Sequence, residues 1–447
     1  MARALIVLAA LLTAGCFKAP MVTSQRSLST WREMQAADTR REPGQPAPGQ
    51  PAPGQALTSD QAYALALSRN PSLAVAEAEV DVAEAEIGAS KQLENPTLRL
   101  TNFQIDETVA GRPGMNLGLR APIPRPGSIQ ARATAARLVA EGAESRAEAA
   151  RRRLRVDIRR HFAELAFYTA DLGELTRAAE LADKRIQQLR ARVEQAVATR
   201  VDLSLAEVEH AELLDELSRV RGELARTEAA LSLLVSPGTR QKFVVDRDEL
   251  KITDVALDRG ALTDKAVGAR QELRETQTRT GEAQAEEYLA RNEAWPWLAW
   301  AQVNYQFRAA SSTAMTTSTP AFGFGLALDI PLFSLNLRKI KAAKAVVRQR
   351  QIEERAAVAL VATEVAAAMA RLETADARVR EIERSLLPQI EEAARHAEAA
   401  LSAGGLDAIK ALEIADRQVA ARRVHLGALY ERRDAVLGLE AALGAAP

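Results

Sequence analysis

Residues 128–196 read SIQARATAARLVAEGAESRAEAARRRLRVDIRRHFAELAFYTADLGELTRAAELADKRIQQLRARVEQA. This stretch contains no proline and only two glycines. Apolar residues recur every seven positions from Ile158 to Val193, and a second seam of this kind runs beside them from Leu154. The pattern predicts one long helix with coiled-coil seams. At 1.5 Å per residue the helix would be about 100 Å long, which exceeds the width of a compact domain.

The composition narrows the possible functions. The 447-residue chain has 59 basic and 59 acidic residues, a balance that gives no sign of a nucleic-acid partner. After the N-terminus no apolar run reaches the ~18 residues that a membrane helix needs, so any crossing of a membrane would use strands. Because no nucleophile elbow, phosphate loop or paired metal motif occurs, we predict neither an enzyme nor a bound cofactor or metal.

The N-terminus has the form of a bacterial lipoprotein signal. Residues 1–15 contain an apolar run and precede the only cysteine, Cys16. We predict cleavage before Cys16, which would then carry a covalent lipid. Ordinary cleavage near Gly15 is the alternative, because Thr13 stands where such signals normally have leucine. The residue after Cys16 is Phe17 rather than aspartate, which resembles the pattern of lipoproteins sorted to the outer membrane.

Residues 16–56 are predicted to be a lipidated tether. They include the near-repeat PGQPAPGQPAPGQ at 43–55, which favours extended polyproline geometry. Such a tether could run along the outside of a folded body or act as a spacer without specific contacts, and the sequence leaves both interpretations open.

The remainder is predicted to be a tandem duplication. Repeat 1 (57–238) has helices, then period-two strands at 97–105 and 114–123, then helices at 128–196 and 201–235. A connector, 239–260, leads to repeat 2 (261–447), with a helix, strands at 297–308 and 321–330, and helices at 335–402 and 406–443. Pro388 predicts a kink or a short unravelled step in the second long helix.

The four strands pose a closure problem. Each is about 10 residues long, the length of an outer-membrane strand, and has one apolar and one polar face. Open sheet edges in lipid are not viable, because each unpaired backbone group costs several kcal/mol. Three copies of the chain would supply twelve strands. The helices would close in the same way, each packing its narrow seams against two neighbours.

From residue 57 to 443 the sequence resembles the TolC-like outer-membrane factor family, the exit ducts of efflux pumps and type I secretion. The motifs that carry the resemblance are LTSDQA at 57–62, NPSL at 70–73, ENPTL at 94–98, VDL at 201–203, LPQ at 387–389 and GGLD at 404–407. There are two departures from the family pattern. The glycine usual before the first helix tip is absent, with Ala196 near that place, and Pro126-Gly127 replaces the usual glycine pair after the second strand.

The resemblance implies a mainly α fold with a small β part. Long antiparallel coiled-coil helices and two β-hairpins would form a homotrimer, with a 12-stranded outer-membrane β-barrel continued by a periplasmic α-barrel. The implied function is a passive water-filled exit duct, opened at its periplasmic helix tips by a partner complex. The implied partners are a periplasmic adaptor (membrane fusion) protein, an inner-membrane transporter of the resistance-nodulation-division type and outer-membrane lipid. The alternative is a lipid-anchored periplasmic coiled-coil adaptor or scaffold, which explains the helices and Cys16 but not two matched hairpins.

Charged residues gather at the two predicted helix tips. The predicted gate comprises Asp202, Gly404, Gly405, Asp407, Lys410 and Glu413, with Glu207 nearby. The functional interpretation is a threefold ring of carboxylates that favours cations and is held shut by salt bridges. The alternative is helix capping by Asp202 and Asp407, and Lys410 could pair with one of the acids. Because the second tip contains a glycine pair, we expect it to move more on opening.

Three further groups of residues allow two interpretations each. Trp295, Trp297 and Trp300 flank the start of a strand and predict an aromatic girdle at a membrane interface, with ordinary sheet packing as the alternative. The four histidines have no partner at metal-ligand spacing, which favours packing or hydrogen bonding over metal binding. The arginines at 151–153 and 155 are interpreted as a solvated helix face.

Overall fold

The computed structural model describes Ser29, Arg32 and residues 56–101, 114–238, 241–251, 258–308, 321–331, 335–403 and 406–444. The chain divides into two units, Met1–Gln55 and Ala56–Pro447. In the first unit only Ser29 and Arg32 are described, and both are helical and exposed. The predicted signal, the predicted lipid site at Cys16 and all of the predicted tether except these two residues and Ala56 therefore lie outside the described residues.

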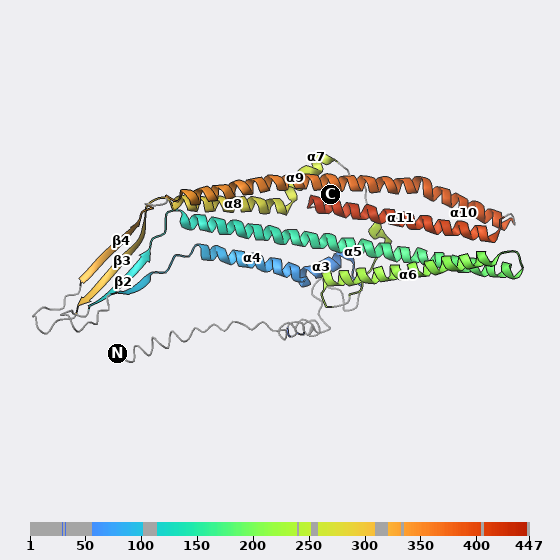
Figure 1. Cartoon of the computed structure of the whole chain (residues 1–447), viewed down its shortest axis with the longest axis horizontal. Coiled ribbons are helices and arrows are strands. Elements are labelled where there is room, and N and C mark those ends of the chain that lie inside the picture. The colour runs from blue at the N-terminus through green and yellow to red at the C-terminus, as the bar shows by residue number, and fades with distance from the viewer. Residues whose placement is uncertain are drawn as a thin grey trace, which may run out of the picture. The chain divides into compact units, whose positions relative to one another are not determined.

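The same order of elements occurs twice along the chain. Repeat 1 contains α3 (Ser59–Arg69), α4 (Pro71–Ser90), β1 (Thr97–Thr101), β2 (Gly114–Pro122), α5 (Ser128–Glu194) and α6 (Arg200–Val235) (Figure 1). Within the connector lies a 3-10 turn, η1 (Arg247–Leu250). Repeat 2 contains α7 (Arg259–Ala269), α8 (Gln271–Asn292), β3 (Trp297–Arg308), β4 (Ala321–Asp329), α9 (Leu337–Glu381), η2 (Ile382–Leu386), α10 (Leu387–Ser402) and α11 (Ala408–Leu443). Residues 102–105, predicted to continue β1, lie outside the described residues.

In each repeat one residue separates the two helices that precede the hairpin. Asn70 accepts hydrogen bonds from Ser72 N (3.0 Å) and Leu73 N (3.2 Å), which caps α4, and its amide donates to Leu234 O (2.9 Å) near the end of α6. In repeat 2, where the pattern predicted a single helix, Arg270 separates α7 from α8. No proline marks this break in the sequence.

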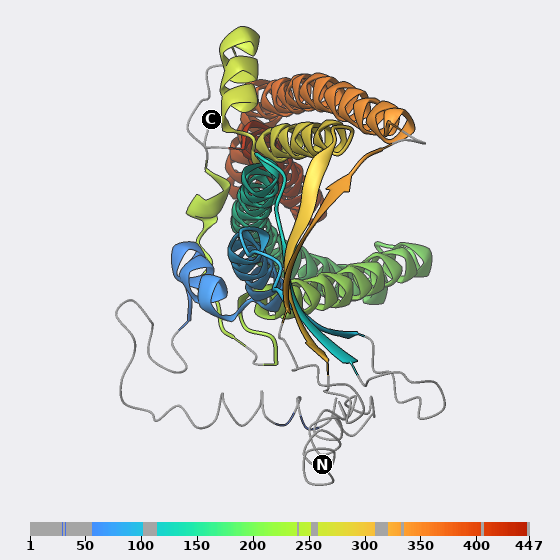
Figure 2. The same cartoon turned by 90° about the vertical axis from the view of Figure 1, so that its left-hand side faces the viewer.

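The helices form one layer. In the half of the layer nearer the sheet, α4, α5, α8 and α9 pack in that order. In the half farther from the sheet, the order is α6, α5, α11 and α9. Viewed end-on, α3 and α7 lie on the same side of this layer (Figure 2). The two long helices, α5 and α9, are therefore separated by α8 and α11 rather than packed along each other.

Helix α5 uses different side chains for its two neighbours. Ile158 and Phe162, both 0% exposed, are among the large residues that pack with α3 and α6. Towards α11 the contact is made by small residues, and Ala163 and Ala166 pack with Leu429. The seven-residue seams predicted the first of these surfaces. The alanine surface was not predicted, because alanine also fills exposed helical positions.

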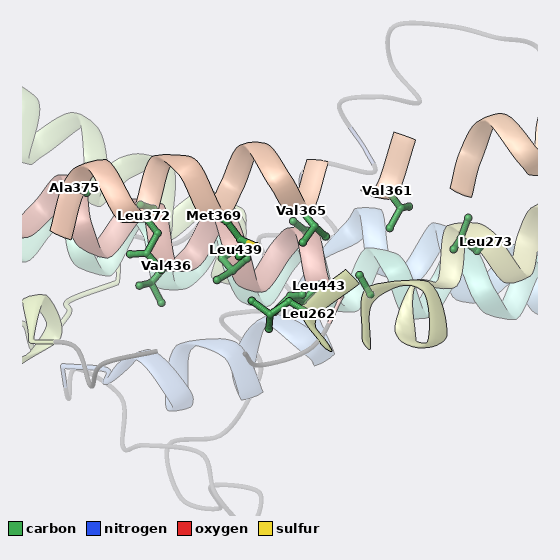
Figure 3. Close-up of a cluster of buried hydrophobic side chains, with 13 residues drawn as sticks. Leu262, Leu273, Val361, Val365, Met369, Leu372, Ala375, Val436, Leu439 and Leu443 are labelled. Atoms are coloured by element: carbon green, nitrogen blue, oxygen red, sulfur yellow. The ribbon is translucent and has the colours of Figure 1, made fainter. Parts of the chain in front are cut away.

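Repeat 2 has its own apolar core, built between α7, α9 and α11 (Figure 3). Leu262 from α7, Val365 from α9 and Leu439 from α11 meet there, and the last two are 0% exposed. This core secures α7 against the layer. It also lies next to the point where α11 ends and α8 begins.

The strands form one antiparallel sheet in the order β1-β2-β3-β4, so β2 and β3 join the two repeats. In β3 the register shifts between Leu298 and Trp300, which leaves Ala299 as an extra bulged residue. Phe322, Phe324 and Leu326 lie on one face of β4 and are 70%, 84% and 70% exposed. The opposite face carries Gln302, Asn304 and three glycines of β2 and β4: Gly118, Gly323 and Gly325.

The start of α5 needs a glycine. Gly127 has φ 74°, a left-handed conformation, and a Cβ there would lie 2.4 Å from the hydroxyl of Tyr288. Although Pro126-Gly127 replaces the glycine pair usual in the family, it keeps a glycine at the one position where a side chain would clash. In repeat 2 the counterpart before α9 is Leu335-Asn336, with φ 40° and 49°, so α9 begins at Leu337, two residues later than predicted.

Pro388 changes the second long helix without unravelling it. The five residues Ile382–Leu386, which precede Leu387-Pro388, form a π-helical turn in which Leu387 N donates to Ile382 O. Proline has no N–H and its ring excludes the preceding carbonyl, so the wider turn absorbs the defect. No helix in the part of the chain that the structure describes is long and apolar enough to cross a membrane.

The double role of Asn70 generates a prediction. Asn70→Ala removes the cap of α4 and leaves Leu234 O without this donor, and we expect it to lower the free energy of unfolding by about 1–3 kcal/mol. Asp258→Ala, which removes only the cap of α7, is the matched control and should cost about half as much or less. Thermal melting followed by circular dichroism checks the order. Equal losses for the two variants would contradict the proposed bond between helices.

Candidate functional site

The first helix tip is closed by a capping box. Thr199 accepts a hydrogen bond from Asp202 N (3.1 Å), and the Asp202 carboxylate accepts from Thr199 N (3.0 Å) and from its hydroxyl (2.7 Å). These hydrogen bonds, the hydroxyl first, hold the pKa of Asp202 below its usual range. Asp202 therefore stabilises the start of α6 by helix capping.

The preceding turn is held by a residue in a strained conformation. Ala196 has φ 58° and follows the last turn of α5. Ala196 N donates to Val193 O (3.1 Å) and Val197 N donates to Arg192 O (2.9 Å). These two bonds define a Schellman motif, which normally places glycine at this left-handed position. Ala196 thus occupies the glycine position of the turn, and the turn forms in spite of the substitution.

The second tip is tied to the first by an ion pair. Both terminal nitrogens of Arg192 on α5 donate to the carboxylate of Asp407, each at 2.7 Å. Asp407 also caps α11 by accepting from Ile409 N (3.3 Å). The Arg192 hydrogen bonds are the main reason that the pKa of Asp407 lies below its usual range. Asp407 therefore caps a helix and pairs across the repeats at the same time.

Arginines of α5 also engage the remaining tip acids. Arg185 lies 2.9 Å from Glu209 and 3.6 Å from Glu413, and Arg190 lies 3.2 Å from Glu207. Lys410 contributes to lowering the pKa of Asp407, but the direct partner of Asp407 is Arg192. These pairs offset much of the negative charge expected of a carboxylate ring. Gly404 and Gly405 lie outside the described residues.

A second tie between the repeats lies further along α5. Arg423 on α11 donates to Asp171 (2.6 Å) on α5 and to Glu216 (2.7 Å) on α6. Asp171 is 5% exposed, so this contact is largely shielded from water. The Arg423 guanidinium holds the pKa of Glu216 below its usual range. Three helices from both repeats are thereby joined through one side chain.

The bulge in β3 determines where the tryptophans point. Because Ala299 is the extra residue, Trp297 and Trp300 both share the face of Gln302. The guanidinium of Arg120 stacks over the Trp300 ring at 3.7 Å, and Trp297 Nε1 donates to Ile123 O (3.0 Å). These two residues thus lie on the polar face of the sheet. Trp295, which is 72% exposed, precedes the strand.

No metal site forms among the described residues. Three histidines lie near single carboxylates: His161 with Glu164 (2.8 Å), His425 with Glu383 (3.0 Å) and His396 with Glu392 (3.6 Å).

Residues 62–236 match the model of a protein family described as outer membrane efflux protein. This part of the chain is similar to outer membrane efflux proteins. It coincides with repeat 1, and the predicted resemblance to TolC-like outer-membrane factors is confirmed. No curated protein sequence matches the chain.

Solved structures with the same fold cover both repeats. CusC, described in connection with transmembrane channel formation, aligns with a TM-score of 0.71 at 19% identity, over 87% of this chain and 92% of its own. The outer membrane protein VceC of Vibrio cholerae aligns with a TM-score of 0.67 at 19% identity, over 87% and 96%. The MtrE outer membrane channel of Neisseria gonorrhoeae, in its open state, aligns with a TM-score of 0.67 at 17% identity, over 87% and 89%. The fold shared with these structures therefore extends through repeat 2, where the family match does not reach.

Sequence reasoning located the tips but not their basic partners. Arg185, Arg190 and Arg192 belong to the charged face of α5 and have no motif of their own. Their spacing of five and two residues is irregular, since they contact different helices. Only the charge excess of the acids opposite them could have indicated that partners were needed.

The strained turn at Ala196 generates a prediction for the first tip. Ala196→Gly should relieve the left-handed strain and stabilise the turn by about 0.5–1 kcal/mol, after allowing for the greater backbone entropy of glycine when unfolded. Hydrogen exchange of the tip amides should slow about threefold. Ala191→Gly, in the last regular turn of α5, is the control and should accelerate the same exchange. Faster exchange in both variants would show that the strain is absent.

Proposed function

We propose that this protein is the outer-membrane channel of a tripartite efflux or export system. It gives substrates a passive, water-filled path from the periplasm to the exterior, and the partner complex supplies the energy. The observation that carries the proposal is the sheet. It presents an exposed apolar face, while its outer strands β1 and β4 each have one strand neighbour among the described residues.

A sheet of this kind calls for further copies of itself. In lipid, β1 and β4 would leave unpaired N–H and C=O groups, whereas pairing β4 of one protomer with β1 of the next removes both edges. Three protomers with four strands each would form a barrel of twelve strands. The apolar face with Phe322, Phe324 and Leu326 would then contact lipid. The polar face, with Gln302 and Asn304, would line the water-filled interior.

The helices support closure of the same ring. The outer helices of the layer, α4 and α6 on one side and α9 on the other, carry exposed apolar residues. Val75 and Val82 on α4 are 60% and 64% exposed, and Ile352 and Leu360 on α9 are 57% and 59% exposed. Two different apolar edges on one protomer suit a head-to-tail interface, which closes into a ring when the rotation permits. The resulting α-barrel would cross the periplasm.

The partners follow from the ends of this barrel. The helix tips would meet a periplasmic adaptor protein, which links the channel to an inner-membrane transporter, with the resistance-nodulation-division type as our proposal. At the opposite end, outer-membrane lipid surrounds the barrel, and a covalent lipid on Cys16 adds a second attachment. The tips are the place where the duct narrows. There the ion pairs of Arg192 with Asp407 and of Arg185 with Glu413 hold together the two helical hairpins of each protomer, α5 with α6 and α10 with α11.

The proposal is tested with the full-length protein in mild detergent. We expect a trimeric mass, and discrete ion conductance after reconstitution into planar bilayers. The variant Cys16→Ser should still require detergent for extraction, because the barrel would hold it in the membrane without a lipid. A monomer without conductance, released from membranes by Cys16→Ser, would overturn the channel and favour a lipid-anchored scaffold.

The pair between Arg192 and Asp407 generates a prediction about opening. Asp407→Asn and Arg192→Ala each remove the bidentate contact, and we expect each to raise the open probability severalfold. The double reversal Arg192→Asp with Asp407→Arg should restore most of the closed state. Arg190→Ala, which breaks only the contact with Glu207 inside the α5–α6 helical hairpin, is the matched control.

Single-channel recording in planar bilayers measures these open probabilities. An unchanged value for Asp407→Asn, or the same rise for Arg190→Ala, would show that the contact between the hairpins does not restrain the gate.

A further inference from the structure

Two arginines lie on the polar face of the sheet. In the register of the strands, Arg120 lies opposite Gln302 and Arg99 lies opposite Gly118, so both arginines share the face of Gln302. The other face of the same two strands carries exposed leucines: Leu98, Leu100 and Leu119. Because side chains alternate along a strand, the pleat that exposes these leucines directs both positive charges to the opposite side.

The contacts of Arg120 orient its charge without neutralising it. Its guanidinium stacks over the ring of Trp300, and its Nε donates to Gln302 Oε1 (3.3 Å). Both partners are uncharged, so the full positive charge remains on the polar face. The stacking fixes the guanidinium in place, because a cation over an indole ring is attracted by the ring's quadrupole.

Arg99 adds a second positive charge next to the first. Its side chain is exposed, and the residue opposite it, Gly118, has no side chain. Arg99 and Arg120 are diagonal neighbours on adjacent strands, which places their backbones about 7–8 Å apart. Like charges at this spacing repel each other unless water and counter-ions screen them. The pair therefore suits a surface that faces salt water.

The acidic residues near the sheet do not offset these two charges. Asp329 is the only acidic residue of the four strands, and it pairs with Arg125 (3.0 Å). Next to the sheet, Glu293 pairs with a lysine of α9, and Glu94 lines a pocket together with Arg132. At the far ends of the helices the tip acids are paired with arginines of α5. The unpaired charge on the described polar face of the sheet is therefore positive.

We propose that Arg99 and Arg120 form a positively charged belt inside the outer barrel, which makes the duct prefer anions over cations. The inference rests on the proposed channel, in which three protomers would bring six arginines to one level of the lumen. Arg99 lies two residues after Thr97 and Arg120 two residues before Pro122, at the strand ends nearest the helices (Figure 1). The belt therefore lies where the helical barrel passes into the β-barrel.

Such a belt selects by charge rather than by one tightly held ligand. Rings of arginine favour anions in pores because they raise the local concentration of negative solutes. In a water-filled lumen, salt screens this field over about 8 Å at physiological ionic strength, so anions are attracted without being trapped. The guanidinium fork matches carboxylate and phosphate groups. Organic anions that carry these groups are the substrate class that the belt favours.

Reversal potentials of the full-length protein in planar bilayers under a KCl gradient test the preference. We expect chloride to be about threefold more permeable than potassium near 0.1 M salt, and nearly equal to it near 1 M, because the screening length falls from about 10 Å to about 3 Å. Arg99→Gln should lower the ratio, and the double variant with Arg120→Gln should abolish the preference. Arg99→Lys is the matched control, since it keeps the charge and should keep the ratio.

The outcomes separate this inference from the channel itself. A conducting channel with equal permeabilities or a preference for potassium near 0.1 M salt overturns the belt and leaves the proposed function standing. The same loss of preference in Arg99→Lys and Arg99→Gln also overturns the belt, because the effect would then not follow charge. A monomer without conductance overturns the channel, and the belt falls with it.

A thiol placed beside the belt reports the local potential even when the tips are closed. Thr97 is exposed and lies opposite Arg120, and Thr97→Cys in the Cys16→Ser background leaves one cysteine in the chain. An anionic and a cationic methanethiosulfonate reagent of similar size are compared, and the ratio of their rates cancels changes in thiol reactivity. We expect neutralisation of both arginines to lower the ratio of anionic to cationic rate about tenfold. An unchanged ratio overturns the proposal.

Discussion

The structure depends on α5 packing on both of its sides within one layer. One side buries large residues such as Ile158 and Phe162 against helices of its own repeat, and the other buries alanines against α11 of the second repeat. Small residues let helix axes approach closely, whereas large residues interlock, so the two interfaces have different geometry. Because every helix in the layer is used laterally, the layer has no central core, and its outer helices keep apolar residues exposed. That exposure leaves the protomer incomplete and accounts for the ring that we propose.

Charged contacts join the repeats where the apolar packing becomes thin. Around Leu165 and Phe162 helix α5 packs over a broad apolar surface, but towards the tips the buried clusters shrink to a few residues such as Ile186 and Leu189. There Arg423, Arg185 and Arg192 bridge to acids of the other repeat. Partly exposed ion pairs such as those of Arg185 and Arg192 contribute little to stability, and they can be exchanged for pairs with water or another protein at small cost. They suit contacts that must hold in one state and separate in another.

The sequence predicted the features that repeat and missed those that occur once. The seven-residue and two-residue periods located the long helices and the strands, because burial on one face imposes a period on the chain. The bulge at Ala299 adds a single residue and turns Trp297 to the polar face, and no period records it. The break at Arg270 has no proline to mark it, and the partner of Asp407 lies 215 residues away. Such features are determined by tertiary contacts, which a single sequence does not display.

The two repeats differ most at their helix ends. The long seams are similar, but Asn70 caps α4 and also bonds to Leu234 O of α6, whereas the Arg270 side chain does not cap α8. The turn after α5 uses Ala196 where a glycine would fit better. A helix interior tolerates substitution as long as its apolar face remains, whereas a cap depends on one side chain with a specific acceptor or donor. Substitutions that accumulate after a duplication therefore have their largest effect at the helix ends. In this chain those ends are the tips, where opening is proposed, and the junction of α11 with α8, where arginines line a cavity.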